Sequence, residues 1–585
     1  MSMRKLFNGA SIDLGVCYYP EHWDASGWAQ DLERMASAGL HTVRVGEFAW
    51  NLTEPADGVF DYSFFDRFLT LAFEKGMQVI FCTPTATPPA WLSTKYPQIL
   101  NADMDGHLYY HGNRRHYNYN SPIYQHYAAR ITRKLAAHFG AHPAIVGWQL
   151  DNEFNCGLDE FYSQSDTLAF QGYLKEKFVT LDRLNRAWGT VFWNQTYTDW
   201  TEISVPRRTH ANSVNPHLQL EYYRFISQSV CRFAGKQAQI IRQYCKPDDF
   251  ITTNGIFANI DYLRLGRESL DFLTYDSYPN FAFSLDAYRK DDPLLDRWSS
   301  AKLTQVRALS PVFGIMEQQS GANGWNTRME TPSPRPGQMS LWTIQSIAHG
   351  ADYVSFFRWR TCTFGTEMYW HGILDYSGRD NCRLREIAAL AKTVESLQPV
   401  AGSRFAAQVA VLEDYDNRWD AQADCWHRRI AQASRDALIQ AFQMSHTPYD
   451  EVYFDDALTP QQMLRKLSGY RAVFYPHACI LTQQRVQILS RYAQDGGQLI
   501  FGCRAGYKDV FGRCVTAPLP GLVREMTGAD VLEYSFIAPD EAPVTVCLDG
   551  KRFEAAVFAE ALAPWTIGRR LLPDMKTASM RSCPR

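Results

Sequence analysis

The sequence predicts an α/β protein: a (β/α)8 TIM barrel, then a smaller α/β domain, then a small β domain. Three observations lead to this fold class. Eight short apolar runs alternate with amphipathic helical stretches from residue 12 to about residue 360. Polar and aromatic residues follow nearly all of these runs. Beyond residue 392 the pattern changes, and a chain of 585 residues is long enough for two or three domains.

The predicted barrel strands are short and apolar. They lie at 14–20, 42–50, 78–85, 145–150, 250–255, 272–279, 311–318 and 353–359. Helical patterns separate them, as at 28–39, 64–76 and 337–350. Each of these three helices has a glycine where its C-terminal cap is needed: Gly39, Gly76 and Gly350. A doubly wound sheet is the competing fold, but no glycine-rich phosphate loop follows the first strand.

The strand ends carry residues that a core cannot easily hold. The stretch WQLDNEF, residues 148–154, ends the fourth strand on Asp151, Asn152 and Glu153. In a (β/α)8 barrel the chemistry lies at the C-terminal ends of the strands. Seven strand ends follow this pattern, with Tyr18, Tyr19, Glu21 and His22; Glu47 and Trp50; Asn152 and Glu153; Asn254; Asp276 and Tyr278; Glu317 and Gln318; Arg358 and Trp359. We therefore expect one functional rim.

The composition of the chain limits the kinds of partner and the cellular compartment that we expect. The net charge is -3, with no basic run or acidic tail, which argues against nucleic acid or an anionic membrane as the main partner. No stretch is long enough to span a membrane, and the first residues do not read as a signal peptide. The 13 cysteines are scattered without a CxxC pair, so we expect reduced thiols in a cytoplasmic protein.

Two carboxylates on the predicted rim suggest a reaction. Glu153 ends the fourth strand and Glu317 ends the seventh. Taken singly, each is more often an exposed loop acid or a salt-bridge partner than a catalytic group. As a pair on one rim with aromatic neighbours, they fit glycosidic bond cleavage, which needs a protonated acid at the leaving oxygen and a second carboxylate at the anomeric carbon.

Several long segments, in order, resemble glycoside hydrolase family 42, the β-galactosidases. They are GVCYYPEHW, RVGEFAW, GNRRHYNYNSPIY, WQLDNEF, LNRAWGTVFWNQTYTDW, GIMEQQSG and FFRWRTCTFGTEMYWHGILD. The resemblance covers residues 12 to about 525. It implies a retaining, exo-acting hydrolase of terminal β-galactosyl residues that acts on short galacto-oligosaccharides and needs no cofactor. In the clan of this family, an Asn-Glu pair ends strand four and a Glu ends strand seven.

The resemblance implies a role for each motif residue. Glu153 would be the general acid/base and Glu317 the nucleophile, and Asn152 would bind the sugar 2-hydroxyl. Around them, Arg115 would contact the sugar, Tyr278 would lie beside the nucleophile and Trp325 would form a stacking wall. Glu367 and His371 would bind the galactose 4- and 6-hydroxyls. Each also has an ordinary structural reading: Arg115 as a surface charge, His371 as a loop histidine and Trp325 as core. The choice between Arg114 and Arg115 stays open.

The two roles need different settings. A general acid needs an apolar or anionic environment that keeps its proton, and a nucleophile stays ionised beside an arginine. Some family members also carry a cysteine cluster that binds zinc near the rim. Here Asn118 stands at the first cluster position and only Cys156 follows Glu153, so we predict no metal.

We expect the barrel to span residues 1–392. The rest of the chain divides into two further parts. Strands at 406–414, 470–476 and 498–502 with intervening helices predict an α/β domain over 393–525. In family 42 this domain resembles a glutamine amidotransferase (flavodoxin-like) fold without its catalysis and builds trimers, so we expect a homotrimer and a structural role for Cys503. Residues 526–585 predict a small β domain, shorter than in the family, with a disordered tail after about residue 568.

Two alternative functions remain at this point. A β-endoglycosidase of the same clan, such as a mannanase or cellulase, would share both glutamates but would work in a long open groove. A non-catalytic sugar-binding protein would keep the aromatic rim without needing the carboxylate pair. The sequence leaves open the preferred linkage, the cellular oligosaccharide and any activity on α-L-arabinopyranosides.

Overall fold

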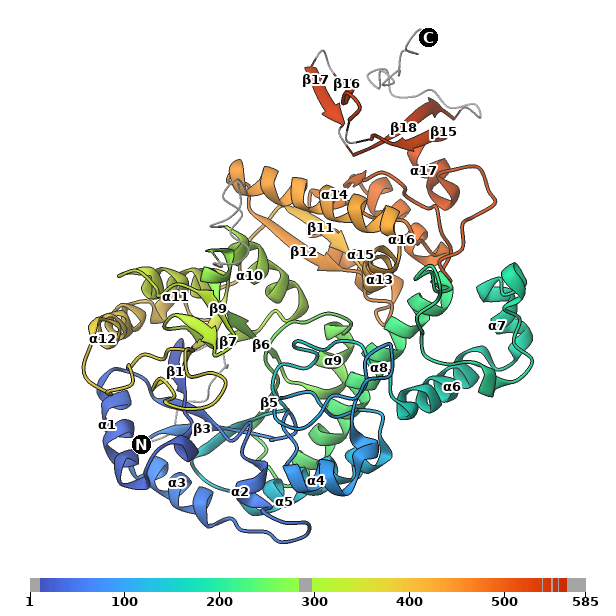
Figure 1. Ribbon diagram of the computed structural model, residues 1–585. Helices are drawn as coiled ribbons and strands as arrows, with labels where there is room; N and C mark the ends of the chain where they lie inside the picture. Colours follow the sequence, from blue (N-terminus) through green and yellow to red (C-terminus); the bar gives the residue numbers. More distant parts are fainter. Residues whose placement is uncertain (1–10, 284–296, 539, 549–550, 556, 566–585) are drawn as a thin grey trace. The chain divides into compact units, whose positions relative to one another are not determined.

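The computed structural model describes residues 11–283, 297–538, 540–548, 551–555 and 557–565 (Figure 1). The chain folds into two compact units. The first contains Met1–Tyr173, Ile203–Arg207 and Arg224–Phe405, and the second contains Leu174–Glu202, Arg208–Tyr223 and Ala406–Arg585.

The first unit is a barrel of parallel strands, which confirms the predicted fold. Its eight strands are β1 (Asp13–Cys17), β2 (Thr42–Val45), β3 (Gln78–Cys82), β4 (Ile145–Gln149), β5 (Phe250–Thr252), β6 (Leu273–Ser277), β7 (Phe313–Gln319) and β10 (Ala351–Phe357). They pair in the order β5-β4-β3-β2-β1-β10-β7-β6. The Thr274 N–H donates to the Thr253 carbonyl at 3.1 Å, so hydrogen bonding also joins the two end strands.

The strands are apolar because both of their faces are covered. Helices lie outside the barrel in Figure 1. Buried side chains of the strands fill its interior. One packed cluster consists of Ile80, Phe250, Phe272, Met316 and Tyr353. A side chain at Gly147 would place its Cβ 2.3 Å from the Phe250 ring, so this strand position needs a glycine.

Helices follow the strands along the chain. They include α1 (Trp28–Ser37), α3 (Ser63–Glu74), α4 (Ala90–Lys95), α5 (Pro122–Phe139), α8 (Pro216–Ile241), α9 (Tyr262–Ser269), α10 (Trp298–Leu309), α11 (Gln338–Ala348) and α12 (Cys382–Ser396). The three predicted helices correspond to α1, α3 and α11. Their capping glycines Gly39, Gly76 and Gly350 have φ values of 83°, 71° and 103°, which a glycine adopts without strain.

The second unit contains a four-stranded parallel sheet. Its strands are β11 (Val409–Glu413), β12 (Tyr449–Tyr453), β13 (Ala472–Tyr475) and β14 (Gln498–Phe501), in the order β12-β11-β13-β14. The helices between them are α13 (Tyr415–Ala423), α14 (Cys425–Met444), α15 (Pro460–Leu467) and α16 (Gln483–Gln494). The order 2-1-3-4 is that of flavodoxin-like sheets, as expected. Strand β12 was not predicted.

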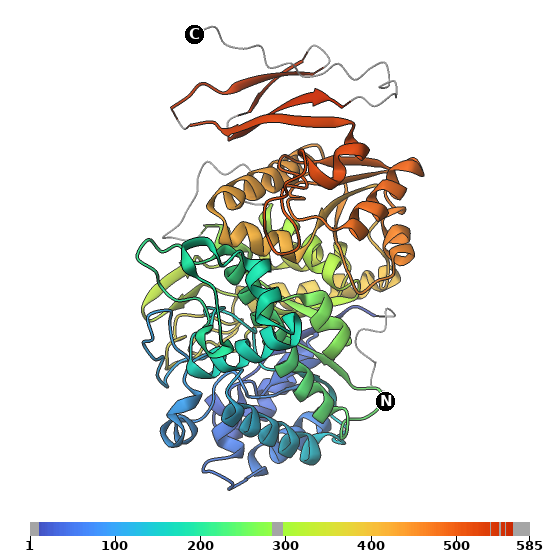
Figure 2. The same cartoon turned by 90° about the vertical axis from the view of Figure 1, so that its right-hand side faces the viewer.

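The described C-terminal residues form antiparallel pairs. β15 (Ala529–Phe536) pairs with β18 (Phe558–Pro564), and β16 (Val544–Leu548) pairs with β17 (Lys551–Ala555). Figure 2 shows these strands as long extended ribbons in red. The predicted disordered tail lies outside the described residues.

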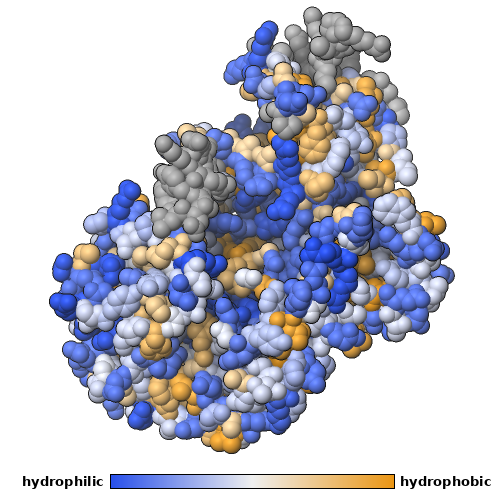
Figure 3. Space-filling view, in the orientation of Figure 1, coloured by the Kyte–Doolittle hydropathy of each residue, from blue (hydrophilic) through white to orange (hydrophobic). Residues whose placement is uncertain are grey.

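The surface is mixed in character. On the face drawn in Figure 3, hydrophilic residues predominate and apolar residues are scattered among them. Among the described residues, no helix has both the length and the apolarity that a bilayer crossing requires.

Candidate active site

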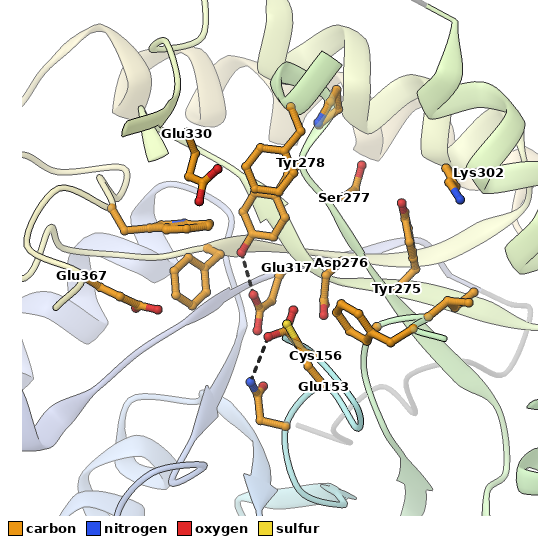
Figure 4. Close-up of a pocket in the computed structure, with 18 of the residues that line it drawn as sticks. Glu153, Cys156, Tyr275, Asp276, Ser277, Tyr278, Lys302, Glu317, Glu330 and Glu367 are labelled. Atoms are coloured by element: carbon orange, nitrogen blue, oxygen red, sulfur yellow. Dashed lines mark hydrogen bonds between the residues drawn. The ribbon is translucent and has the colours of Figure 1, made fainter. Parts of the chain in front are cut away.

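A cavity of about 600 Å³ lies at the C-terminal ends of the barrel strands. Residues that end or follow β1, β2, β4, β5, β6, β7 and β10 line it (Figure 4), so the predicted rim forms one site. Most of the predicted site residues lie in its wall, namely Asn152, Glu153, Tyr278, Glu317, Trp325 and Glu367. Arg115 and His371 do not.

Three carboxyl groups meet in this cavity. One oxygen each from Glu153, Asp276 and Glu317 lie within 4.8 Å of one another. All three side chains are buried, and Figure 4 shows their carboxyl groups converging. Three carboxylates this close repel one another when all are ionised, and burial together with this repulsion holds the pKa of Asp276 well above its usual range.

Glu317 is held by donors on three strands or strand ends. Arg44 donates from Nη1 to Oε1 at 2.7 Å, Tyr278 donates its hydroxyl to Oε2 at 2.6 Å, and Asn254 Nδ2 lies 3.1 Å from Oε1. Burial raises the pKa of Glu317 to about 7, although Arg44 and the Tyr278 hydroxyl both favour the ionised form. These contacts fix the carboxylate on one side of the cavity.

Arg44 also explains two other rim residues. Its Nη2 donates to Glu47 Oε1 at 2.6 Å, and both side chains are fully buried. Glu47 therefore balances Arg44 inside the barrel. Trp50 is fully buried too, and its indole N–H bonds Glu54. Neither residue is an exposed wall of the rim.

Glu153 stands on a strained turn. Asp151 and Glu153 have φ values of 55° and 51°, in the left-handed region. The Glu153 N–H donates to Asn254 Oδ1 at 2.9 Å, which supports this backbone. Its carboxylate accepts a 2.5 Å hydrogen bond from Arg114, so it faces a cation as well as the anionic partners expected for a general acid.

The structure separates the two neighbouring arginines. Arg114 lines the cavity and also donates to Cys156 Sγ at 3.3 Å. Arg115 is buried behind it, ion-paired to Asp151 at 2.7 Å and bonded to the backbone carbonyls of residues 152 and 153. The choice between the two arginines was left open by the sequence; in the structure Arg114, and not Arg115, lines the cavity, and the Arg115 backbone has a φ of 68°.

The remaining predicted residues have different surroundings. Asn152 Nδ2 lies 3.4 Å from Glu153 Oε2, and Asn254 bonds its Oδ1 at 3.0 Å. Trp325 stands in the cavity wall with the Arg328 guanidinium 4.4 Å from its ring centroid. Glu367 lines the cavity 3.8 Å from Arg358, whereas the His371 ring lies beside Tyr376, outside the cavity lining.

Aromatic rings build one side of the cavity. The Trp370 ring stands edge-on to those of Tyr278, Phe281 and Phe357, with centroids 5.3, 6.1 and 6.2 Å away. Flat apolar rings of this kind suit the apolar faces of a sugar. Sequence reasoning had not placed Trp370 or Phe357 in the site, although both lie in the segment 356–375 that carries the resemblance.

The two positions that correspond to the zinc cluster of some family members make other contacts here. Asn118 donates to Asp166 at 2.6 Å, and Cys156 accepts from Arg114. In the second unit, Cys503 has no histidine among its described contacts, and burial raises its pKa to about 12. Cys479 lies 3.5 Å from His427, which bonds Asp420, but burial holds the pKa of this thiol well above its usual range, so it is not an activated nucleophile.

Three polar residues of the site had no role assigned from the sequence. Arg44 sits inside the apolar run of the second strand, and an arginine at such a position indicates an internal ion pair. Asn254 and Asp276 were placed on the rim without a role. Asn254 now bridges Asn152, Asp276 and Glu317 through its Nδ2, at 3.0, 2.9 and 3.1 Å.

Comparisons with known proteins identify the family. A family model described as beta-galactosidase, glycoside hydrolase family 42, matches residues 17–397, and one described as beta-galactosidase trimerisation domain matches residues 407–568. A β-galactosidase of Halorubrum lacusprofundi is 37% identical over 541 residues, which is 89% of this chain and 74% of that protein. One from a Thermus species is 34% identical, covering 94% and 85%.

Solved structures show the same relation. The β-galactosidase from the haloarchaeon Halorubrum lacusprofundi superposes with a TM-score of 0.86 at 32% identity, over 97% of this chain and 84% of that one. The β-galactosidase of Marinomonas ef1 gives a TM-score of 0.84 at 29% identity, over 94% and 84%. The chain therefore belongs to glycoside hydrolase family 42 and is a β-galactosidase.

Proposed function

We propose that the enzyme works by double displacement, with Glu317 as nucleophile and Glu153 as general acid/base. The observation that carries this proposal is a pair of buried carboxyl groups in one cavity, with oxygens within 4.8 Å of each other. Glu153 follows β4 and Glu317 lies near the end of β7. A retaining mechanism needs carboxyl groups about 5–5.5 Å apart, whereas an inverting one needs about 6.5–9.5 Å to admit water. The short separation supports retention.

The Glu317 and Glu153 carboxyl groups have different hydrogen-bond surroundings. Glu317 receives hydrogen bonds from Arg44, Tyr278 and Asn254, which stabilise an anion ready to attack the anomeric carbon. Glu153 lies on the loop after β4 with Asn152 beside it. In the first step Glu153 gives its proton to the glycosidic oxygen while Glu317 bonds the anomeric carbon. In the second step Glu153 takes a proton from water, which attacks that carbon and releases Glu317.

Recognition of galactose involves the cavity wall. Asn152 is proposed to bind the 2-hydroxyl, and Arg114 to contact the sugar near the acid. Trp325 provides a stacking surface, and Glu367 accepts hydrogen bonds from the 4- and 6-hydroxyls. His371, the other residue predicted to bind these hydroxyls, has its ring beside Tyr376 and outside the cavity lining.

The cavity supports an exo-acting enzyme on short galacto-oligosaccharides. About 600 Å³ is within the range for a small-molecule pocket, roughly 300–1,000 Å³, and smaller than the long groove of an endo-acting enzyme implies. Family membership now disfavours the mannanase or cellulase alternative and the non-catalytic sugar-binding alternative. A panel of β-1,3, β-1,4 and β-1,6 galactosyl disaccharides, with aryl α-L-arabinopyranoside, identifies the preferred linkage and ring substituent.

We further propose that the chain assembles as a homotrimer. Each chain would have three domains: a catalytic barrel over 1–392, a trimerisation domain over 393–525 and a small β domain over 526–585. The match of residues 407–568 to a trimerisation domain model supports this. Exposed apolar side chains at Val191, Phe192 and Trp193 support a subunit contact as well. The eleven cysteines whose side chains the structure describes are free thiols, which supports a cytoplasmic location.

The carboxylate roles are tested by substitution and azide rescue. Glu317→Ala abolishes turnover, because no glycosyl-enzyme forms. Glu153→Ala retains activity on aryl galactosides with good leaving groups, which need little protonation, and azide restores turnover with β-galactosyl azide as product. An α-azide product, or identical behaviour of the two variants, removes these assignments.

A further inference from the structure

Asp276 is a third carboxyl group in the cavity that the proposed mechanism does not use. It lies near the end of β6, and the register between β6 and β7 shifts between Tyr275 and Asp276, so that Asp276 pairs with Glu317. A β-bulge of this kind re-aims side chains next to active sites. Here it brings Asp276 to the carboxyl groups of Glu317 and Glu153 (Figure 4).

One oxygen of Asp276 accepts a hydrogen bond from a donor among the described residues. Oδ2 accepts from Asn254 Nδ2 at 2.9 Å, whereas Oδ1 is buried without a donor, and the Asp276 side chain is within hydrogen-bonding reach of the Glu153 carboxyl group. The side chain is 8% exposed. A buried carboxylate oxygen without a donor is costly, but a protonated Oδ1 becomes a donor itself, and the nearby acceptors are carboxylates.

The charged groups around Glu153 and Asp276 are compatible with one proton shared between these two carboxyl groups. The groups that face Glu153 and Asp276 are the carboxylate of Glu317, the cations Arg44 and Arg114, and the neutral Cys156, Tyr262, Tyr275 and Tyr278. Arg44 is hydrogen-bonded to Glu317 and Glu47, and Arg114 is hydrogen-bonded to Glu153, so among the described residues neither arginine donates to Asp276. Burial and the two neighbouring carboxyl groups hold the pKa of Asp276 well above its usual range.

We propose that Asp276 is a positioning residue that shares one proton with Glu153 and supplies it for leaving-group protonation. This inference rests on the proposed role of Glu153. In the free enzyme Arg114 donates a 2.5 Å hydrogen bond to Glu153, and the shared proton resides on Asp276. A general acid held beside an arginine can thus be protonated when it is needed.

The proton moves twice without any further reactant. As the first step begins, the proton passes from Asp276 to Glu153 and then to the glycosidic oxygen, while the bond from the anomeric carbon to that oxygen breaks and the bond to Glu317 forms. In the second step water gives its proton to Glu153 and its oxygen to the anomeric carbon, and Glu317 leaves. Asp276 and Glu153 then share the proton again.

Asp276→Asn keeps the shape of the side chain but cannot share the proton in this way. We expect kcat/KM on lactose, a poor leaving-group substrate, to fall by about 100-fold or more, within the range of general acid catalysis. The value for a 2,4-dinitrophenyl galactoside should fall by less than about fivefold. The alkaline limb of the lactose pH profile should move down by about one pH unit, because the substitution removes the buried Asp276 carboxyl group, whose raised pKa retains the shared proton.

A second variant and a control complete the test. Asp276→Ala leaves space for formate, which should restore lactose turnover if a carboxyl group is what is missing. Asp352→Asn removes another buried carboxyl group, at the opposite end of the barrel, and should leave the profile unchanged. Equal losses on both substrates with an unmoved pH profile, or no formate rescue in folded Asp276→Ala, overturn the inference. Failure of azide rescue in Glu153→Ala instead refutes the proposed function.

Discussion

Arg44 donates a 2.7 Å hydrogen bond to Glu317, although the two residues are 273 positions apart in the chain. The bond crosses the interior of the barrel from β2 to β7, and the Arg44 side chain is fully buried. The same guanidinium bonds Glu47, so one cation holds two carboxylates. The position and charge of the proposed nucleophile therefore depend on a residue of another strand.

Arg44→Met should impair both stability and activity. Removing one partner of a buried ion pair leaves uncompensated carboxylates, which costs about 3–5 kcal/mol of unfolding free energy. Without Arg44, Glu317 also holds its proton more strongly, so kcat/KM should fall at neutral pH. Denaturant unfolding and galactoside kinetics measure both effects. Arg34→Met, at an ion pair with the exposed Asp380, should cost only about 0–1 kcal/mol; equal effects of the two variants would contradict the assigned role of Arg44.

Tyr278→Phe should shift the acid limb of the pH profile. The Tyr278 hydroxyl donates to Glu317 and favours its ionised form, so its loss raises the pKa of Glu317 further above about 7. Since the nucleophile must be ionised, the limb should move to higher pH. A hydrogen bond to a charged group contributes about 1.5–3 kcal/mol, so kcat/KM should fall by roughly 10–150-fold. Tyr492→Phe, in the second unit, is the matched control; an unmoved limb in Tyr278→Phe would exclude this contact from catalysis.

The sequence predicted the barrel because its strands are apolar runs with polar ends, and both features are local. It could not predict partners. Glu47 and Trp50 follow a strand as rim residues do, but both are buried. Glu47 is hydrogen-bonded to Arg44, and Trp50 to Glu54. Strand β12 was missed because Glu451 interrupts its apolar pattern; the structure shows Glu451 buried and paired with Arg435 at 2.5 Å. Asp276 was visible on the rim, but the register shift that brings it to Glu317 is not visible in sequence.

Arg114 and Arg115 should differ in what their loss affects. Arg114→Gln should lower kcat/KM by roughly 10–150-fold, because a hydrogen bond to a charged group contributes about 1.5–3 kcal/mol, and should leave the melting temperature nearly unchanged. Arg115→Gln should instead lower unfolding free energy by about 3–5 kcal/mol, because Asp151 loses its buried partner. Thermal unfolding and kinetics on both variants separate these outcomes. The reverse pattern would return the sugar contact to Arg115.

Chelators should leave activity and melting temperature unchanged. Asn118 is engaged by Asp166 and Ser163, and Cys156 by Arg114, so these two positions do not offer the thiolates of a tetrahedral zinc site. The measurement is turnover and thermal unfolding before and after treatment with EDTA and 1,10-phenanthroline. Stoichiometric zinc in elemental analysis of the purified protein would contradict the prediction.

Phe192 and Trp193 should contribute to a subunit contact. They are 63% and 77% exposed, next to Val191 at 85%, and Trp193 and Asn194 have φ values of 55° and 54°. Large apolar side chains on a strained surface turn are costly in water unless another surface covers them. A homotrimer with closed cyclic symmetry would have a mass of about 200 kDa, three times the 67.0 kDa chain. Light scattering should give this mass for the wild type and a smaller mass for Trp193→Ser, while Val59→Ser, at an exposed apolar residue of the barrel unit, should keep the wild-type mass. A wild-type monomer with full activity would show that no neighbouring subunit is needed.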